Sequence, residues 1–523
     1  MFLGFTYDLL MKYFLLPLIF ALVFSCASQE NSTSVEEPVS AFYESELKPF
    51  YHGVASGDPY PNSVLLWTRV TPNLNANKIE GTWEIAADSL FSELINNGTF
   101  ETDSTKDFTV KVIADALNAD TRYFYRFKAL DAYSLVGKTK TAPETANEIN
   151  FAVVSCSNYQ FGAFNAYANI SKKQQLDAVI HLGDYFYEYG RGTYGDTTMK
   201  RFHIPEHELI ALDDYRTRYS QYRLDPDLRQ MHATHPFIAI WDDHEIANDA
   251  YKTGAQNHQE DEGDYMERKR AAIKAYYEWM PVRRVDPLYR TFTFGNLVDL
   301  IMLDERTEGR TEQLDSITDD RIDSSSQRML GKKQLAWLQN ELNTSEASWK
   351  VIGNQVIFSY LNYGYKNFNI NLDSWDGYPY ERTQLKQTIM DNDIENVLFI
   401  TGDTHSSWAF EVTDKPFEEY DAETSSGAFA IEFGATSVNS GNANERFPDD
   451  TVKMHEQKIL GADFNPHLKY TNLRDHGYLL LNLTDSVATA SWYYVNSMNN
   501  KDKGAYLGMQ VSTRSGDNKI RKN

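Results

Sequence analysis

Metal-binding side chains follow apolar segments at four places in this 523-residue chain, and this pattern constrains the fold most strongly. The first two segments are residues 151–154, which run into Cys156, and residues 177–182, which run into Asp184 and Tyr187. Short runs rich in Val and Ile predict buried strands. Helical spacing of apolar residues between them predicts a strand–helix–strand unit with parallel strands. The carboxyl edge of such a sheet is where ligands bind.

Two later segments repeat this arrangement. They end in further pairs of ligand-type side chains, Asp243 and His244 after residues 236–241, and Asp403 and His405 after residues 397–401. One acidic strand end is an ordinary turn. Four such ends in one domain predict a site for two or more metal ions at one sheet edge.

The donor types indicate which metals the site would bind. Thiolate, phenolate and imidazole groups suit a ferric ion, whereas carboxylate oxygens suit a hard divalent ion such as Ca²⁺. A carboxylate has two oxygens, so Asp184 could bridge both metals. Two metals about 3.5–4 Å apart would clamp a phosphoryl group and activate an attacking hydroxide.

The order of predicted elements indicates an α/β protein with a second domain. Residues 47–143 contain short alternating strands and predict a small β-sandwich domain. Residues 150–498 alternate strands and helices and predict the catalytic domain, and residues 499–523 predict a polar, frayed tail. The net charge of −24 argues against a nucleic-acid partner, because phosphate backbones need a basic face.

The N-terminus has the pattern of an export signal. Residues 1–26 contain an apolar run of signal-peptide length and end in a lipobox-like sequence at Cys26, and residues 27–46 have the composition of a linker. We therefore expect an exported protein that is lipid-anchored through Cys26, and a plain cleaved signal is the alternative. Only two cysteines exist, so Cys156 then has no disulfide partner, and metal ligation explains its presence.

Specific motifs connect the chain to a known family. The stretches that carry the resemblance are residues 154–158, 181–189, 241–245 and 402–408, with residues 52–59 at the start of the N-terminal domain. The set resembles the PhoD-like alkaline phosphatase family, within the calcineurin-like metallophosphoesterases, over about residues 47–496. The resemblance implies a metallophosphoesterase-type layered sheet-and-helix catalytic domain after the β-sandwich.

The family also implies one Fe³⁺ beside Ca²⁺ ions. By matching position, the iron ligands would be Cys156, Asp184, Tyr187 and His405, and the calcium ligands would be Asp184, Asp243 and Asp403. Asn354, at the end of a strand that begins at Trp349, is a further candidate calcium ligand. His244 would stabilise the phosphoryl oxygen or protonate the leaving group. For Arg306 the alternatives are a pair with substrate and a structural pair with Asp304, and the structural pair is expected.

These features predict a secreted alkaline phosphatase of the cell envelope that hydrolyses phosphate esters. A metal-bound hydroxide would attack phosphorus in line, without a covalent enzyme intermediate. One alternative is a phosphodiesterase or phospholipase on the same scaffold. Another is a non-catalytic lipoprotein that binds through its β-sandwich. The sequence indicates no protein partner.

Overall fold

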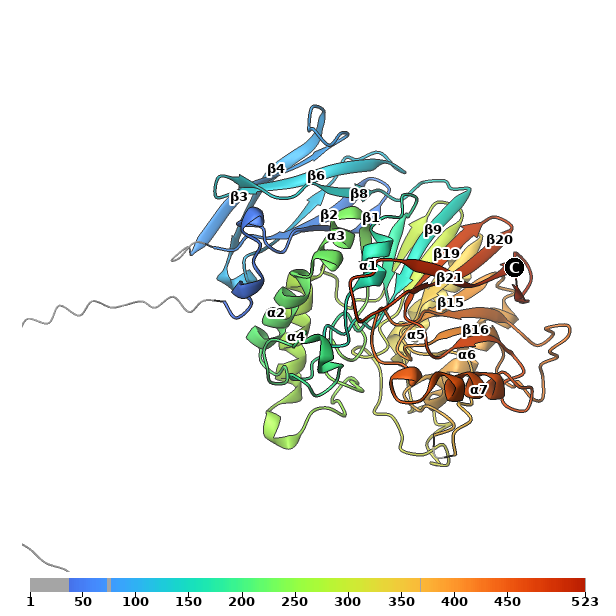
Figure 1. The fold of residues 1–523 in the computed structure, drawn as a ribbon. Helices are drawn as coiled ribbons and strands as arrows, with labels where there is room; N and C mark the ends of the chain where they lie inside the picture. The colour runs from blue at the N-terminus through green and yellow to red at the C-terminus, as the bar shows by residue number, and fades with distance from the viewer. Residues whose placement is uncertain (1–36, 73–76, 367, 523) are drawn as a thin grey trace, which may run out of the picture. The chain divides into compact units, whose positions relative to one another are not determined.

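Three parallel strands lie at the centre of the fold in the computed structural model, which describes residues 37–72, 77–366 and 368–522. The strands are β9 (Glu148–Val154), β10 (Ala178–His181) and β11 (Pro236–Ala239). Strand β10 pairs in parallel with both neighbours, and helix α1 (Asn165–Ile170) connects β9 to β10. The predicted strand–helix–strand unit is therefore confirmed (Figure 1).

These strands belong to the first of two large sheets. Its other strands in the described chain are β1 (Val54–Tyr60), β2 (Ser63–Arg69), β5 (Thr109–Ala114), β19 (Gly477–Thr484), β20 (Val487–Val495), β21 (Ala505–Arg514) and β22 (Arg521–Lys522). The order across the sheet is β22-β21-β20-β19-β9-β10-β11-β1-β2-β5. Strands from both ends of the chain therefore flank the central parallel strands.

The second large sheet packs against the first. Its described strands are β12 (Arg290–Phe294), β13 (Val298–Met302), β14 (Trp349–Gly353), β15 (Val397–Thr401), β16 (Ser407–Val412), β17 (Ala430–Gly434) and β18 (Leu468–Asn472), in the order β12-β13-β14-β15-β17-β16-β18. Phe151 of β9 contacts Phe294 of β12, with ring centroids 4.9 Å apart. Leu300 and Met302 of β13 belong to this shared core, so the two sheets form the inner layers.

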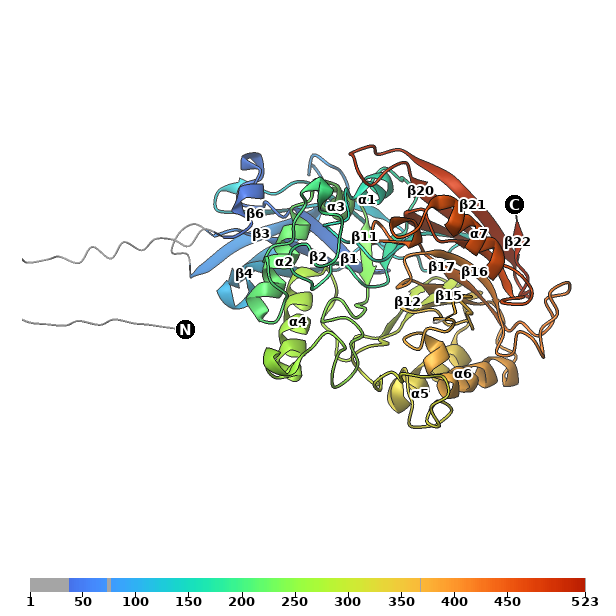
Figure 2. The same ribbon diagram turned by 60° about the horizontal axis from the view of Figure 1, so that its bottom comes forward.

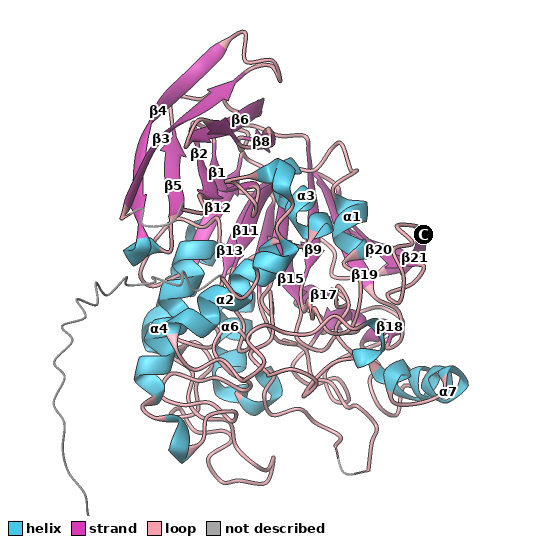
Figure 3. Ribbon diagram, turned by 60° about the vertical axis from the view of Figure 1, so that its left-hand side comes forward, coloured by secondary structure: helices cyan, strands magenta, loops and turns pink. Residues whose placement is uncertain are grey.

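Helices cover the outer faces of the two sheets. They are α2 (Leu212–Arg223), α3 (Pro226–Thr234), α4 (Tyr265–Trp279), α5 (Gly331–Thr344), α6 (Pro379–Asp391) and α7 (Asp449–Ile459). Tyr167 of α1 and Met231 of α3 pack on the first sheet, whereas Leu338 of α5 and Leu385 of α6 pack on the second. Figure 2 shows α5 and α6 beside β15, and Figure 3 shows the long loops that lie beyond the strands. This layered arrangement agrees with the predicted fold class.

The N-terminal region is a sandwich that shares a sheet with the rest of the protein. Its own sheet contains β3 (Lys78–Ala86), β4 (Leu94–Asp103), β6 (Arg122–Ala129), β7 (Ala132–Tyr133) and β8 (Gly137–Lys140). This sheet shares a core with β1, β2 and β5 through residues such as Leu66 and Phe127. Strand β1 also pairs in parallel with β11 through Ser56 and Pro236, so the region is joined to the central strands by backbone hydrogen bonds.

The expected frayed tail over residues 499–523 is wrong. Residues of this segment form β21, which pairs with β20 from Val487 to Val495. Only some of its side chains are buried, among them Val511 and Thr513, so a largely polar segment can still form an ordered strand.

The predicted export signal and Cys26 lie outside the described residues. In the part of the chain that the structure describes, no helix is long and apolar enough to cross a membrane.

Candidate metal centre

Three of the four strand ends that carry ligand-type side chains share an unusual backbone conformation. Cys156, Asp184, Asp403 and His405 have φ angles of 58°, 55°, 61° and 61°. Non-glycine residues rarely adopt positive φ, and each instance costs about 1–3 kcal/mol unless the surroundings enforce it. Strain of this kind gathers at functional sites, so these ends are candidates for a built centre rather than ordinary turns.

Glycine is required immediately before one of these residues. Gly183 has a φ of +105°, and a Cβ added there would lie 2.3 Å from Cβ of Asp242. The absence of a side chain lets the chain turn sharply after β10 and brings Asp184 beside the end of β11.

The structure brings the predicted ligands from both large sheets together. Three groups have ligand atoms within 4.8 Å of one another: Cys156, Asp184 and His405; Asp184, Asp243 and His244; and Asp242, Asp243 and Asp403. Asp184 belongs to the first two groups, and Asp243 to the last two. A shared carboxylate is what a bridged pair of metal sites needs, so the arrangement can hold two neighbouring cations.

Tyr187 and His405 are oriented toward this cluster. The Tyr187 hydroxyl lies 3.2 Å from Oδ2 of Asp184 and 2.9 Å from Nε2 of His405. Nδ1 of His405 donates a hydrogen bond of 2.7 Å to the carbonyl oxygen of Gly441, so Nε2 carries the lone pair that can bind a cation. Burial lowers the pKa of His405 to about 4, so the imidazole is neutral.

The electrostatics of the cluster favour positive ions. Burial, reinforced by Asp184, raises the pKa of the Cys156 thiol well above its usual value. Burial and the surrounding carboxylates also raise the pKa of Asp184 and that of Asp403. Oδ1 of Asp184 is buried and has no hydrogen-bond partner among the described residues. A buried oxygen without a partner costs free energy, and cations in the cluster would both satisfy it and stabilise the ionised donors.

His244 is held beside the cluster by a buried carboxylate. Its Nδ1 lies 2.6 Å from Oε2 of Glu188, whose other oxygen accepts hydrogen bonds from the Asn248 backbone and the Asn257 amide, both at 2.8 Å. Burial lowers the pKa of His244, but Asp243 and Glu188 outweigh it and hold the pKa well above the ordinary value. The imidazole is therefore held as a proton donor at the edge of the cluster.

Arg306 lies inside the carboxylate cluster, and the expected structural pair with the Asp304 side chain is wrong. The guanidinium donates to Oδ1 of Asp242 at 2.5 Å and to both oxygens of Asp373 at 2.8 and 2.9 Å. Asp304 instead accepts the backbone N–H of Arg306. Nη2 also lies 3.7 Å from Oδ1 of Asp403, so one buried cation offsets part of the negative charge.

From the sequence, Asp242 and Glu188 were not predicted to contribute to the candidate metal centre. Asp242 stands beside the predicted Asp243 in the acidic run after β11, and this adjacency was a usable signal. Glu188 follows Tyr187 directly, but its role depends on contact with a residue 56 positions away.

Asn354 follows β14 at the same end of the second sheet, but its amide is engaged elsewhere. Its Oδ1 accepts a hydrogen bond of 3.0 Å from Trp375, and its Nδ2 donates to the carbonyl oxygen of Val356. The oxygen retains one lone pair, so Asn354 stays a prediction as a ligand.

Comparisons with known proteins agree with this geometry. Residues 151–492 match the family model described as PhoD-like phosphatase, and residues 37–143 match that of the PhoD-like phosphatase N-terminal domain. Alkaline phosphatase D of Bacillus subtilis (strain 168) is 38% identical over 445 residues, which span 81% of this chain and 74% of that protein. A solved structure of PhoD has a TM-score of 0.81 at 34% identity and covers 91% of this chain and 92% of its own.

Proposed function

The chain belongs to the PhoD-like phosphatase family and is a phosphoric ester hydrolase, and we propose that it is an exported alkaline phosphatase that depends on Fe³⁺ and Ca²⁺. The observation that carries the proposal is the convergence of three groups of mostly buried donors, which overlap through Asp184 and Asp243. The hydrogen-bond vacancy at Oδ1 of Asp184 supports a cation there.

The donor chemistry supports a division between two kinds of ion. The ferric ligands would be Cys156, Asp184, Tyr187 and His405; the calcium ligands would be Asp184, Asp243 and Asp403, with Asn354 as a further candidate. When bound, the ions would polarise the phosphoryl group and supply the attacking hydroxide. The two ligand sets differ in chemistry, because one contains a thiolate, a phenolate and an imidazole and the other contains carboxylate oxygens. This difference favours two different metals over two identical ones.

The protein's own residues would orient the ester and manage its protons. His244 faces the shared carboxylates, and Asp243 and Glu188 raise its pKa, so it is placed to stabilise a phosphoryl oxygen and to protonate the leaving group. Glu188 fixes the imidazole through Nδ1, which leaves Nε2 for the ester. Arg306 holds Asp242 and Asp373 in place from the buried side.

The proposal is tested by a panel of phosphate monoesters and diesters together with metal analysis of the purified protein. We expect hydrolysis of monoesters at alkaline pH and the presence of both iron and calcium. A preference for diesters would assign the phosphodiesterase or phospholipase alternative. Protein without iron and without hydrolysis would support a non-catalytic surface lipoprotein.

A further inference from the structure

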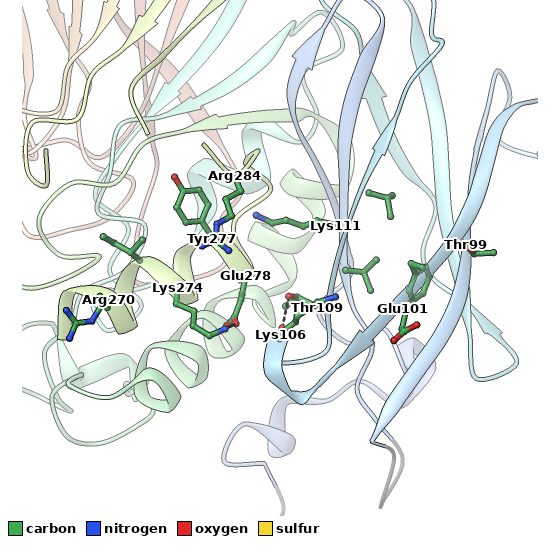
Figure 4. Close-up of a pocket in the computed structure, with 14 residues that line it drawn as sticks. Thr99, Glu101, Lys106, Thr109, Lys111, Arg270, Lys274, Tyr277, Glu278 and Arg284 are labelled. Carbon is green, nitrogen blue, oxygen red and sulfur yellow. Dashed lines mark hydrogen bonds and ion pairs between the residues drawn. The ribbon is translucent and has the colours of Figure 1, made fainter. Parts of the chain in front are cut away.

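A cavity lies between the N-terminal region and helix α4. Its volume is about 840 Å³, and its lining contains Thr99, Lys106 and Lys111 on one side and Lys274 and Tyr277 on the other. Figure 4 shows Lys111 of β5 on one side of this space and Lys274 and Tyr277 of α4 on the other. Cavities of this size hold small organic ligands. None of its lining residues belongs to the candidate metal centre.

The lining is strongly basic although the chain as a whole is acidic. It contains five basic side chains, Lys106, Lys111, Arg270, Lys274 and Arg284, and two carboxylates, Glu101 and Glu278. The chain carries a net charge of −24, so this local excess of cations runs against its average composition. Such a concentration of one charge in a concave surface attracts ligands of the opposite sign.

Both carboxylates of the lining are already paired with cations that do not line the cavity. Glu278 accepts two hydrogen bonds of 2.8 Å from Arg216, one to each oxygen, and it also pairs with Lys274 of the lining. Glu101 lies 2.5 Å from Nζ of Lys78. These pairs remove most of the negative charge that could otherwise neutralise the cations of the cavity.

Three of the lining cations make no ion pair within the described residues. Nζ of Lys111 donates to the carbonyl oxygen of Val282 at 2.8 Å, and the Arg284 guanidinium lies 5.8 Å from the ring centroid of Tyr277. Lys106 is exposed at the mouth. In Figure 4 the Lys111 side chain extends toward Tyr277 and Arg284. Each of these groups retains donors for a ligand.

The apolar part of the lining narrows the class of ligand. Phe100 and Val110 lie on the β4–β5 side, and Ile273 and Tyr277 lie on α4. An inorganic anion would leave these surfaces without contacts, whereas an organic molecule with clustered anionic groups would use both kinds of surface. We propose that this cavity binds a small organic polyanion carrying several phosphate or sulfate groups, at a site separate from the metal centre.

Lys111 supplies a signature that a nonspecific surface interaction would lack. Burial lowers the pKa of Lys111 to about 7, and the charged groups around it are Asp58 of β1, Glu278 of α4, Arg284 and Arg290 of β12. Above neutral pH the amine is largely neutral, and a bound anion favours its protonated form. Binding near pH 8 should therefore take up about one proton, and uptake should fall toward zero near pH 6 because the amine is already charged.

The test is isothermal titration of the metal-loaded protein with inositol hexasulfate, which is not a phosphate ester. We expect one site per chain, an affinity that falls with salt, and weak competition by inorganic sulfate at an equal sulfate concentration. Titrations near pH 8 in buffers of different ionisation enthalpy would measure the proton uptake. Lys111→Arg should keep the binding and lose the proton uptake, because arginine stays charged.

Variants in which two cations are replaced by glutamate test whether the probe binds in this cavity or at another surface. Lys106→Glu with Arg284→Glu should weaken binding at least about tenfold without changing hydrolysis of a small phosphate ester, since both side chains are exposed and outside the metal centre. Lys453→Glu with Arg514→Glu, two exposed cations elsewhere, is the matched control. Equal losses in both double variants, or an unchanged affinity in the first, would overturn the proposal. Loss of binding only in Asp403→Asn would place the probe at the metal centre and would also overturn it.

Discussion

Cys156 is the residue whose role is most open to a direct test. It is fully buried at a strained strand end, beside Asp184 and His405. We expect Cys156→Ala to lose the visible thiolate-to-iron absorption, most of the iron and most of the activity. The fold should persist because only one sulfur atom is removed. Absorption spectroscopy and metal analysis would check this, and a colourless wild type with full activity would contradict it.

The contact between Glu188 and His244 predicts an effect that depends on the leaving group. Glu188→Gln should lower the turnover of alkyl phosphates, which need a proton, by on the order of tenfold to a hundredfold. Nitrophenyl phosphate should be affected less, because its leaving group is stable as an anion. The measurement is kcat for a series of leaving groups.

Glu208→Gln is the matched control for this change. Glu208 is partly buried, whereas Glu188 is fully buried, and it pairs at 2.8 Å with a different residue, Arg268. An equal loss for every leaving group in Glu188→Gln would show that the carboxylate acts on structure and not on proton donation.

At the scale of elements, the turn after β10 determines how closely two strand ends approach. Gly183→Ala places a Cβ 2.3 Å from Cβ of Asp242 and 2.4 Å from its backbone nitrogen. The backbone must shift, so we expect loss of bound metal and of activity together with a lowered free energy of unfolding. Denaturant unfolding and metal analysis would measure the two effects.

Gly263→Ala separates backbone strain from the steric clash. Gly263 has a φ of +92°, and a Cβ added there meets nothing within 4 Å. This variant should lose only about 1–2 kcal/mol, the cost of an alanine at positive φ, and should keep its metals. If both variants behaved alike, the approach to Asp242 would not be the cause.

At the scale of the whole molecule, the candidate centre joins the two large sheets. Asp184 and Asp243 follow strands of the first sheet, and Asp403 follows β15 of the second. Removal of calcium with EGTA should therefore abolish activity reversibly and lower the unfolding temperature. A ligand present at 100 times its Kd stabilises the folded state by about 2.7 kcal/mol.

Iron content gives the internal control for the chelation experiment. Iron held by a thiolate and a phenolate should remain bound through EGTA treatment, so the colour should persist. Added Ca²⁺ should restore activity, because a site made of oxygen donors prefers calcium to zinc. Restoration by Zn²⁺ but not by Ca²⁺ would show that the second metal is assigned wrongly.

The attachment of the molecule to a membrane is a separate prediction from its N-terminal sequence. Cys26→Ser should move the protein from the membrane fraction to the soluble fraction, because stable anchoring needs more than one acyl chain and these would be attached at Cys26. Fractionation followed by an activity assay measures this. Wild-type protein already in the soluble fraction would indicate an ordinary cleaved signal.

Local sequence was sufficient to predict the central strands and the residues that follow them. The apolar runs before Cys156, Asp184, Asp243 and Asp403 are short and rich in β-branched residues, and such runs are recognisable without knowledge of their neighbours. Parallel strands align their carboxyl ends, so the gathering of Cys156, Asp184 and Asp243 at one edge could also be predicted. The prediction of a single edge is wrong for Asp403, which follows β15 of the second sheet and reaches the others because the two sheets pack together.

Only the tertiary structure decided which distant groups complete the site. Arg306 lies 64 residues from Asp242 and 67 from Asp373 in the sequence, yet all three meet inside the protein. The tail forms strand β21 because it pairs with the edge of β20. The polar sequence of the tail does not indicate that this edge is available. Sequence periodicity records which face of an element is buried, whereas the identity of the neighbour depends on how separate elements pack.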